Sequence, residues 1–531
     1  MMSRLVRILA VFSCATTLAS CGGGGSASPP PPPPGSGWQP GVYADFIGFF
    51  ARCEDPRAGV NPQSGRPWPD VQGTTLDENN FLRSYSNDTY LWYDEIVDRD
   101  PGLYNDPRDY FALLKTSATL PSGRPKDPDS FHFWYDTNEW LNLQAGITFG
   151  YGAELAILSA TPPREVVVAF TEPNSPASNA SIERGARVVG VDGFDINTNT
   201  QAGIDALNDA IFPDTNGEMH TFSILDYGAA NPRDVTLTAT TINETFVKNA
   251  VVLDTPTGSV GYMLFTSHRP PAEEELIDAV TMFNAHNGGQ GIDDLVLDLR
   301  YNGGGLLYMG SQLAYMIAGA GQINGRDFEN TQFNDKHPTI DPVTGETIEP
   351  VPFVDETIGF DALPAGQPLP TLDLPRVYVL TGSNTCSASE AVMNGLRGVD
   401  VEVIQIGGTT CGKPYGFYPT DNCGTTYFTV QFRGVNAKNY GDYVEGFRPS
   451  VVDDGESQVQ GCAVADDFSQ PLGNQAENRF EVALAHQAGM GCVEPVGAAG
   501  GSLSKPAFDP DIADGELRKS PFDTNRIYHR P

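Results

Sequence analysis

Hydrophobic positions in the second half of the chain alternate between two kinds of pattern. Short apolar runs typical of buried strands lie at residues 258–266, 293–300, 376–381 and 401–407. Between them, apolar residues recur at helical spacing over 273–286, 304–319 and 387–398. This alternation predicts βαβ units around a mostly parallel sheet, an α/β fold whose site lies beyond the carboxyl ends of the strands. Residues 321–372, rich in Asp, Pro and Gly, are predicted to form a long excursion without a core of its own.

The first half of the chain shows two other patterns. Residues 38–144 are predicted to be mainly helical, with an aromatic stripe through 77–97 that we expect to be core. Residues 145–243 change to short strands with one amphipathic segment at 202–211, which predicts a β-rich domain. We therefore expect an α/β plus β protein.

The first 37 residues carry targeting signals rather than fold. MMSRLVRILAVFSCATTLASC, residues 1–21, has the Arg-containing start, apolar stretch and small residues of a secretion signal. LASC resembles the cleavage box of bacterial lipoproteins, which implies lipidation of Cys21, and Gly22 after it implies the outer membrane. Residues 22–37, GGGGSASPPPPPPGSG, are predicted to be a tether that holds a lipid-anchored domain away from a membrane. A soluble secreted protein is the alternative.

Composition narrows the functional classes. The net charge of −35 argues against a nucleic-acid partner, because phosphate binding needs basic patches. Beyond the signal and Cys21, six cysteines in an oxidising compartment allow up to three disulfides, with 15 possible connectivities. Their irregular spacing and the few histidines nearby predict no metal site. These six are Cys53, Cys386, Cys411, Cys423, Cys462 and Cys492.

The stretch TCSASEAVMNGLRG, residues 385–398, offers two roles for Ser387. Glu390, three residues later and ahead of an apolar run, completes the signature of a helix capping box. The same position, at a helix N-terminus behind a strand, also suits a nucleophile near amide donors. Ser389 lies two residues deeper in the helix, where its side chain should point elsewhere. Ser387 can be the helix cap and the nucleophile at once.

The stretch GGTTCGKPYG, residues 407–416, contains Lys413. Its GxxxxGK pattern matches the start of a phosphate-binding loop, but Pro414 stands where Ser or Thr is required, and no helix can follow. We therefore predict no nucleotide and no other cofactor. Lys413 is either a solvated surface charge or, if buried among neutral neighbours, a general base whose charged form is disfavoured.

Together these stretches resemble the carboxyl-terminal processing proteases, serine peptidases with a Ser–Lys dyad. The resemblance implies Ser387 as nucleophile, Lys413 as general base and an α/β core of the ClpP/crotonase type. LDLRYNGGG, residues 297–305, is similar to the family's oxyanion element, which implies amides of Gly303 or Gly304 with Ala388. EGFRPSVVDD, residues 445–454, is similar to a family segment near the end of the core. The likeness covers roughly residues 75–490.

The middle of the chain resembles a PDZ domain of the bacterial protease type. The resemblance is carried by GITFGYG, residues 146–152, and by NSPASNASIERGARVVGVDG, residues 174–193. It implies binding of an extended peptide at a sheet edge. A β-rich domain without a ligand is the alternative. The whole chain then divides into a signal (1–21), a tether (22–37), a helical domain (38–144), a PDZ-like domain (145–243), a protease core (244–495) and a tail (496–531).

Three features depart from the family pattern. Many members have Gln or Glu four residues after the lysine to orient it, and this chain has Phe417. Cys386 and Cys411 adjoin the nucleophile and the base, so a disulfide of either would brace or restrict the site. The related tricorn core proteases use a histidine ahead of the PDZ domain; His132 lies in that region as a reserve base, although a histidine among aromatic residues is usually packed core.

The sequence therefore predicts a lipid-anchored serine endopeptidase of the cell envelope that cleaves unfolded or C-terminally presented polypeptide segments. The alternative is a non-catalytic peptide- or ligand-binding lipoprotein on the same scaffold. Substrate preference, oligomeric state and any gating by the PDZ-like domain are left open by the sequence.

Overall fold

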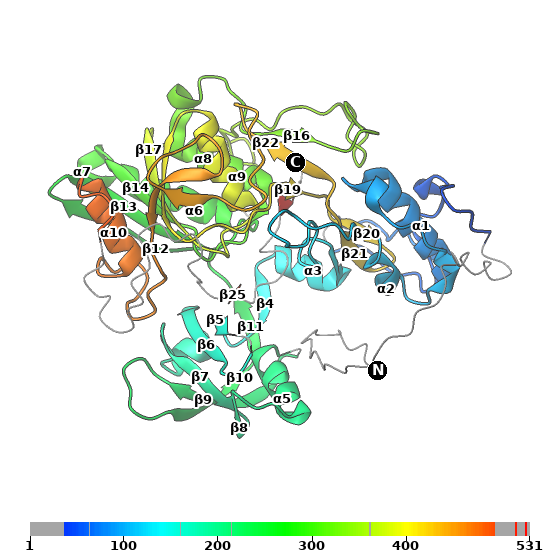
Figure 1. Cartoon of the computed structure of the whole chain (residues 1–531), viewed down its shortest axis with the longest axis horizontal. Helices are drawn as coiled ribbons and strands as arrows, with labels where there is room; N and C mark the ends of the chain where they lie inside the picture. Colours follow the sequence, from blue (N-terminus) through cyan, green and yellow to red (C-terminus); the bar gives the residue numbers. More distant parts are fainter. Residues whose placement is uncertain are drawn as a thin grey trace, which may run out of the picture.

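The computed structural model describes residues 37–62, 64–159, 161–213, 215–360 and 363–493, and two short strands at 516–517 and 526–527. The predicted signal, the lipidation site at Cys21 and nearly all of the tether lie outside these residues. Within the described part of the chain, no helix combines the length and the apolar character needed to cross a membrane. Figure 1 shows three parts, which we call the front part (residues 37–144, blue to cyan), the middle part (residues 145–243, cyan to green) and the core (residues 244–493, green to orange).

The core is built on a seven-stranded sheet, as the alternating pattern predicts. Its order is β12-β13-β14-β17-β18-β24-β23, and all neighbours are parallel except β12 and β13. The mixed α/β prediction is confirmed. The strands are β12 (Val247–Thr255), β13 (Gly258–Phe265), β14 (Asp294–Asp298), β17 (Arg376–Thr381), β18 (Glu402–Gly407), β24 (Gln458–Ala463) and β23 (Arg448–Ser450).

Helices cover both faces of this sheet because successive strand residues point to opposite sides. On one face, Leu295 and Leu297 of β14 pack in the same apolar cluster as residues of three helices. On the other face, Val296 packs with Phe480 of α10 (Asn478–Gln487). The three helices are α6 (Ala272–Asn284), α8 (Leu307–Ile323) and α9 (Ala388–Gly398).

The described part of the excursion at 321–372 has few regular elements. Its strand β16 (Asn330–Gln332) pairs with β22 (Phe432–Val435) of the core. Phe328, Val351 and Phe353 are buried in the main apolar cluster. The excursion therefore packs on the core of its neighbours instead of forming its own.

The front part contains less helix than the aromatic stripe predicts. Helix α1 (Thr75–Thr89) begins at a Thr74–Asp77 capping box and buries Phe81 and Tyr85, as expected. It ends at Thr89 because Tyr90 is extended and donates its hydroxyl to Asp127 at 2.6 Å. The remaining α-helices of the front part are the short α2 (Pro107–Phe111) and α3 (Thr137–Gln144), and η1 (Phe46–Gly48), η2 (Tyr93–Glu95) and η3 (Pro101–Leu103) are 3₁₀ helices.

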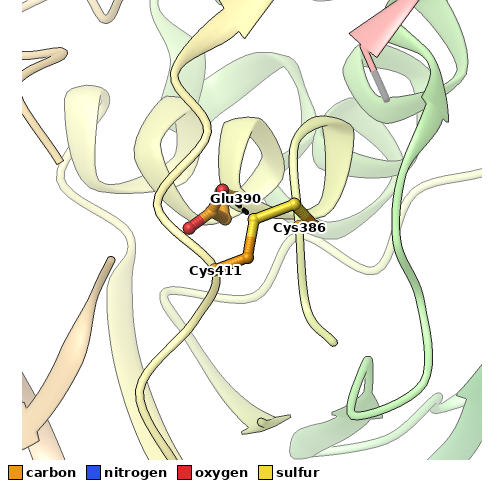
Figure 2. A group of neighbouring side chains, drawn as sticks. All are labelled: Cys386, Glu390 and Cys411. Atoms are coloured by element: carbon orange, nitrogen blue, oxygen red, sulfur yellow. Dashed lines mark hydrogen bonds between the residues drawn. A yellow bond between two sulfur atoms is a disulfide. The ribbon is translucent and has the colours of Figure 1, made fainter. Parts of the chain in front are cut away.

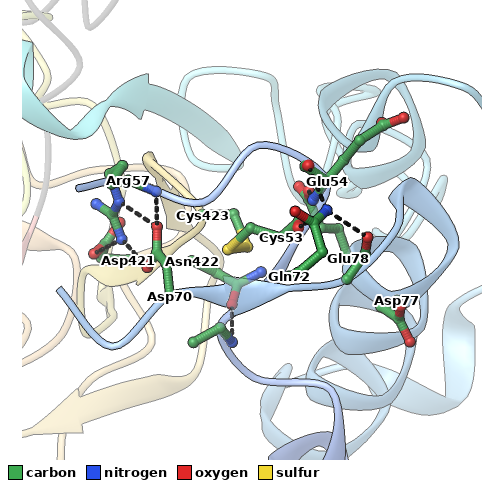
Figure 3. Close-up of a disulfide and its surroundings, with 12 residues drawn as sticks. Cys53, Glu54, Arg57, Asp70, Gln72, Asp77, Glu78, Asp421, Asn422 and Cys423 are labelled. Atoms are coloured by element: carbon green, nitrogen blue, oxygen red, sulfur yellow. Dashed lines mark hydrogen bonds and ion pairs between the residues drawn. A yellow bond between two sulfur atoms is a disulfide. The ribbon is translucent and has the colours of Figure 1, made fainter.

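The front part is joined to the core by strand pairing and by a disulfide. β3 (Phe133–Asp136) pairs antiparallel with β21 (Thr425–Phe428), which also pairs with β20 (Thr420–Asn422). Figure 3 shows the Cys53–Cys423 disulfide beside them, with Arg57 paired to Asp70 and Asp421. These links hold the front part against the strands that follow Lys413.

The middle part is an antiparallel sheet with one long helix, α5 (Gln201–Ile211). The sheet order is β10-β9-β7-β6-β5-β25, and β4 pairs separately with β11. Its strands are β4 (Ile147–Gly150), β5 (Ala153–Ser159), β6 (Glu165–Thr171), β7 (Arg187–Val191), β8 (Phe194–Asp195), β9 (Met219–Leu225), β10 (Arg233–Thr238), β11 (Thr240–Asn243) and β25 (Glu516–Leu517). The short strands predicted within 145–243 and a helix at the predicted amphipathic segment are present.

Candidate active site

Ser387 lies at the sharp turn between β17 and α9, and its side chain is buried. Its backbone has φ 59° and ψ −109°, in the left-handed half of the map that a residue with a Cβ adopts only when its surroundings enforce it. Strained turns of this kind present a nucleophilic serine between a strand and a helix. Ser389 points away, as predicted, and its Oγ donates to the carbonyl of Asn302 at 3.0 Å.

Glu390 binds the turn of Ser387 and the loop of Lys413 at the same time. Its buried carboxylate accepts the backbone N–H of Ser387 at 3.0 Å, and those of Gly412 and Lys413 at 2.8 Å each. The hydroxyl of Thr410 also donates to it. Burial raises the pKa of Glu390, and these four donors act in the opposite direction. Part of the predicted capping box is thus confirmed, and it extends to the loop of the candidate base.

A disulfide joins Cys386 to Cys411, with the two Cα atoms 5.2 Å apart. It links the residue before Ser387 to the residue two before Lys413, next to Glu390 (Figure 2). The sulfurs and the Glu390 carboxylate are close enough to suggest a metal site, but sulfurs joined to each other cannot serve as thiolate ligands. The disulfide instead braces the two loops.

Lys413 lies in a buried position lined by aromatic rings. Its side chain is shielded from solvent, and Nζ lies 4.2 Å from the ring centre of Phe131 and 5.0 Å from that of Phe417. Loss of water works against a charged ammonium, whereas the faces of the two rings favour it. The surface-charge alternative is therefore wrong. Phe417, where many relatives have Gln or Glu, forms part of this aromatic wall.

Asp127 is a buried carboxylate near this pocket. Burial raises its pKa to about 6, while the Tyr90 hydroxyl and the charges of Lys115 and Lys413 lower it. Its Oδ2 accepts a hydrogen bond from the hydroxyl of Tyr90 at 2.6 Å. The front part therefore supplies the site with a ring, Phe131, and with a carboxylate.

The loop Asn302–Gly304 is fixed against the start of α9. The backbone carbonyl of Asn302 accepts a hydrogen bond from the N–H of Cys386 at 3.1 Å. The side-chain Oδ1 of Asn302 accepts a second one from the N–H of Gly304 at 2.9 Å. The Gly304 amide is thus engaged, which leaves Gly303 as the better partner for Ala388 in an oxyanion hole. His268 Nδ1 lies 3.1 Å from two acceptors, Asn302 Oδ1 and the carbonyl of Gly304, so Nδ1 carries the proton.

Arg300, two residues before Asn302, anchors this loop to the sheet. Its buried guanidinium pairs with Glu477 at 2.7 and 2.8 Å, with Asp466 at 2.8 Å and with Asp298. Burial raises the pKa of Asp466, but the charges of Arg184 and Arg300 outweigh it and hold that pKa well below its ordinary value. Such a paired and hydrogen-bonded cluster fixes the loop geometry.

His132, the reserve base, is packed in the front part. Its ring stacks on Phe111 at 4.0 Å between centroids, and its nitrogens bond to Thr429 Oγ1 at 3.0 Å and to the Phe111 carbonyl at 2.8 Å. Burial lowers the pKa of His132 to about 3. Both nitrogens are thus used for packing, which supports the interpretation of His132 as core.

Replacing His132 by Gln should flatten the dependence of stability on pH. The unfolded chain takes up a proton near pH 6.5, while folded His132 stays neutral to about pH 3, so stability is lost as pH falls from 6.5. At about 1.4 kcal/mol per pH unit, the parent should lose roughly 2 kcal/mol more than the variant between pH 7 and pH 5. Urea unfolding at the two pH values measures this difference, and equal losses would contradict the assignment.

Sequence patterns did not identify four of these site residues. Asp127 and Phe131 are far from Lys413 along the chain, and no local pattern indicates that they meet it. Asn302 lies inside the quoted LDLRYNGGG stretch, where the motif alone did not reveal its bonds. His268 follows the end of an apolar strand. Because sites in parallel sheets lie beyond the carboxyl ends of the strands, this position could have been predicted as a site residue.

Parts of the chain match models of a known peptidase family. Residues 259–445 match the model of peptidase family S41, and residues 77–131 match the S41 N-terminal domain. The first matched range covers most of the core and contains both Ser387 and Lys413.

Two curated relatives are carboxyl-terminal processing enzymes. The chain is 24% identical over 329 residues to carboxyl-terminal-processing peptidase 2, chloroplastic, of Arabidopsis thaliana, which covers 61% of this chain and 56% of that protein. It is 28% identical over 251 residues to the carboxyl-terminal-processing protease of Synechocystis, covering 46% and 54%. The chain thus spans about half the length of the curated relatives it matches.

A solved structure shares the fold. The crystal structure of a protein from Bacteroides fragilis described as an S41 protease superposes with a TM-score of 0.54 at 21% identity. The match covers 80% of this chain and 99% of that one.

Proposed function

We propose that the protein is a serine endopeptidase in which Ser387 and Lys413 form the catalytic dyad. The observation that carries this proposal is the Glu390 carboxylate, which binds the backbone of both residues and so fixes their loops relative to each other. The strained φ of Ser387 and the aromatic burial of Lys413 support the same roles.

In this proposal, the dyad carries each step of peptide-bond cleavage. Ser387 Oγ attacks the carbonyl carbon while the neutral amine of Lys413 takes the hydroxyl proton. The amides of Gly303 and Ala388 donate to the oxyanion that forms. When the tetrahedral intermediate collapses, Lys413 returns the proton to the leaving amine, which leaves an acyl group on Ser387. A water then attacks this ester and gives a proton to Lys413, and as the intermediate collapses Lys413 returns that proton to Ser387 Oγ while the carboxylic acid product departs.

The substrates we propose are extended, unfolded or C-terminally presented polypeptides. A hollow of about 1450 Å³ is lined by the front part, by residues 147–155 of the middle part and by Thr266, Ser267 and Arg269 of the core. Its lining includes the segment that resembles the ligand loop of a PDZ domain, which would hold a peptide by strand addition. Ser387 and Lys413 do not line the hollow, so it would receive substrate rather than cleave it.

We further propose that the protein acts in the cell envelope, lipid-anchored at Cys21. The lipoprotein-like LASC box and the tether after it support this location. All six cysteines from Cys53 to Cys492 are paired, as Cys53–Cys423, Cys386–Cys411 and Cys462–Cys492, which suits an oxidising compartment.

Cleavage of an unfolded protein tests the proposed activity. The chain from Trp38 onward should fragment casein, and Ser387→Ala should abolish the fragments. Ser389→Ala is the matched control: it removes a hydroxyl two residues away that binds Asn302, and it should retain cleavage. Fragments of equal intensity from Ser387→Ala would refute the dyad, whereas the absence of fragments from every form would favour the non-catalytic binding protein.

A further inference from the structure

His268 is a completely buried histidine that lies three residues beyond the end of β13. Its Cδ2 lies close to Gly310 of α8, and the carbonyl of Ala388, at the start of α9, is near the same glycine. The residues on either side of it, Ser267 and Arg269, line the hollow proposed to receive substrate. The imidazole is therefore located between this hollow and the residues of the proposed oxyanion hole.

The proposed oxyanion donor, the amide of Gly303, belongs to a run of three glycines. Gly304 has φ 117° and Gly305, the first residue of β15 (Gly305–Leu306), has φ 129°, values that residues with a Cβ rarely adopt. A glycine backbone has many alternative conformations, so an amide within this run keeps one direction only if neighbouring groups hold it. The direction matters because an oxyanion donor is effective when it is already aligned before the reaction.

His268 holds the glycine run through both its backbone and its side chain. Its backbone N–H donates to the carbonyl of Gly304 at 2.9 Å, and its own carbonyl accepts from the N–H of Leu306 at 2.9 Å. Its side-chain Nδ1–H is shared between the carbonyl of Gly304 and Oδ1 of Asn302, at 3.1 Å each. The Nδ1–H thus ties the residue before Gly303 to the residue after it.

The stability of the fold does not account for this imidazole. Both acceptors of the Nδ1–H have another donor: Oδ1 of Asn302 accepts from the N–H of Gly304, and the Gly304 carbonyl accepts from the backbone N–H of His268. Within the described part of the chain, the buried Nε2 of His268 has no hydrogen-bond partner, which costs stability. Burial also lowers the pKa of His268 to about 4, so the ring is neutral at pH 7. An apolar side chain of similar size would stabilise the fold at least as well.

We propose that His268 is a positioning residue of the active site, whose Nδ1–H fixes the direction of the Gly303 amide toward the oxyanion. The proposal rests on the proposed function and adds to it a residue outside the serine and lysine motifs. His268 acts through the loop Asn302–Gly304, so it aligns a donor that is used when the oxyanion forms. Its loss should therefore lower kcat and leave KM nearly unchanged.

Two substitutions separate the Nδ1–H donor from the bulk of the ring. His268→Leu removes the donor and keeps an apolar side chain, whereas His268→Asn keeps an N–H donor near the position of Nδ1. With casein, His268→Leu should lower kcat about 10²-fold with KM within about twofold, as expected for a misaligned oxyanion donor. His268→Asn should bring kcat back to within about fivefold of the parent. An unchanged kcat in His268→Leu, or equal losses in the two variants, would overturn the proposal.

Ser311→Ala is the control, and it should show the opposite behaviour. Ser311 follows Gly310 on α8, and its buried hydroxyl donates to the carbonyl of Pro352 at 2.6 Å and accepts from the N–H of Val354 at 2.9 Å. Its removal leaves both groups without this partner, so the urea midpoint should fall while kcat per folded molecule is retained. In His268→Leu the urea midpoint should stay or rise while kcat falls. A lower midpoint with kcat retained in His268→Leu would show a structural role and overturn the proposal.

Hydrogen exchange tests the positioning without requiring catalysis. In the full-length Ser387→Ala chain, adding His268→Leu should make the amides of 302–306 exchange at least about tenfold faster, and adding His268→Asn instead should keep them slow. Amides of β18, in the same sheet, serve as the control and should be unchanged. Equal exchange at 302–306 in all three chains would overturn the proposal. Absence of cleavage in every form, the parent included, would count against the proposed function alone, and the exchange result would then decide whether His268 holds the loop.

Discussion

Replacing Lys413 by Met should lower kcat/KM for an unfolded protein by about 10³ to 10⁴, with the fold retained. Met keeps most of the length of the lysine stem between Phe131 and Phe417 but cannot take the proton of Ser387. The loss matches what removal of a general base costs when the oxyanion hole remains.

Lys126→Met is the matched control for this variant. Lys126 Nζ also lies over an aromatic ring, 4.5 Å from the centre of Trp92, and it pairs with Glu95 on the front part. This substitution should leave kcat/KM within about twofold, because exposed ion pairs contribute little. Initial rates with both variants, normalised to folded protein, make the comparison. A Lys413→Met enzyme as active as Lys126→Met would exclude Lys413 as the base.

Replacing Glu390 by Gln should lower both activity and stability. The amide places an NH₂ group among four donors, so at least one buried N–H or O–H loses its acceptor, at about 1–3 kcal/mol each. The loops of Ser387 and Lys413 then lose their common anchor. We expect the free energy of unfolding to fall by about 2–4 kcal/mol and kcat to fall roughly 10²-fold, since small errors in alignment slow the reaction by that order.

Glu273→Gln separates these two effects. Glu273 is also buried, and its carboxylate accepts backbone N–H groups of Ile358, Gly359 and Phe360, far along the chain from the dyad. Its replacement should cost similar stability but leave kcat per folded molecule intact. Denaturant unfolding of both variants measures the loss of stability, and single-turnover cleavage measures the loss of kcat per folded molecule. If Glu390→Gln loses stability without losing kcat, Glu390 stabilises the fold and does not align the dyad.

The sequence predicts the local parts of the site well. The strand before Ser387 and the helix after it follow from hydrophobic spacing and from a capping signature, which act over a few residues. Glu390 could be assigned to that cap for the same reason. The hydrogen bonds of Glu390 to Gly412 and Lys413 could not be predicted, because they depend on how two loops from neighbouring strands meet.

Tertiary contacts decide what local patterns leave open. The choice between Gly303 and Gly304 rests on the Asn302 side chain, which occupies the Gly304 amide. The disulfide pairing was one of 15 possibilities until the fold brought Cys386 beside Cys411. The end of α1 at Thr89 depends on Asp127, a residue outside the helix whose carboxylate binds Tyr90. Each of these results depends on residues that are distant in sequence.

The central claim, that Ser387 is the nucleophile, is tested most directly by trapping the acyl-enzyme. The chain from Trp38 onward is mixed with a peptide p-nitrophenyl ester, quenched with acid during turnover, digested and analysed by mass spectrometry. The account predicts that the peptide containing Ser387 gains the mass of the acyl group, that Ser389→Ala retains this adduct and that Ser387→Ala loses it. An acyl group on any other residue during turnover, with Ser387 unmodified, would contradict the account.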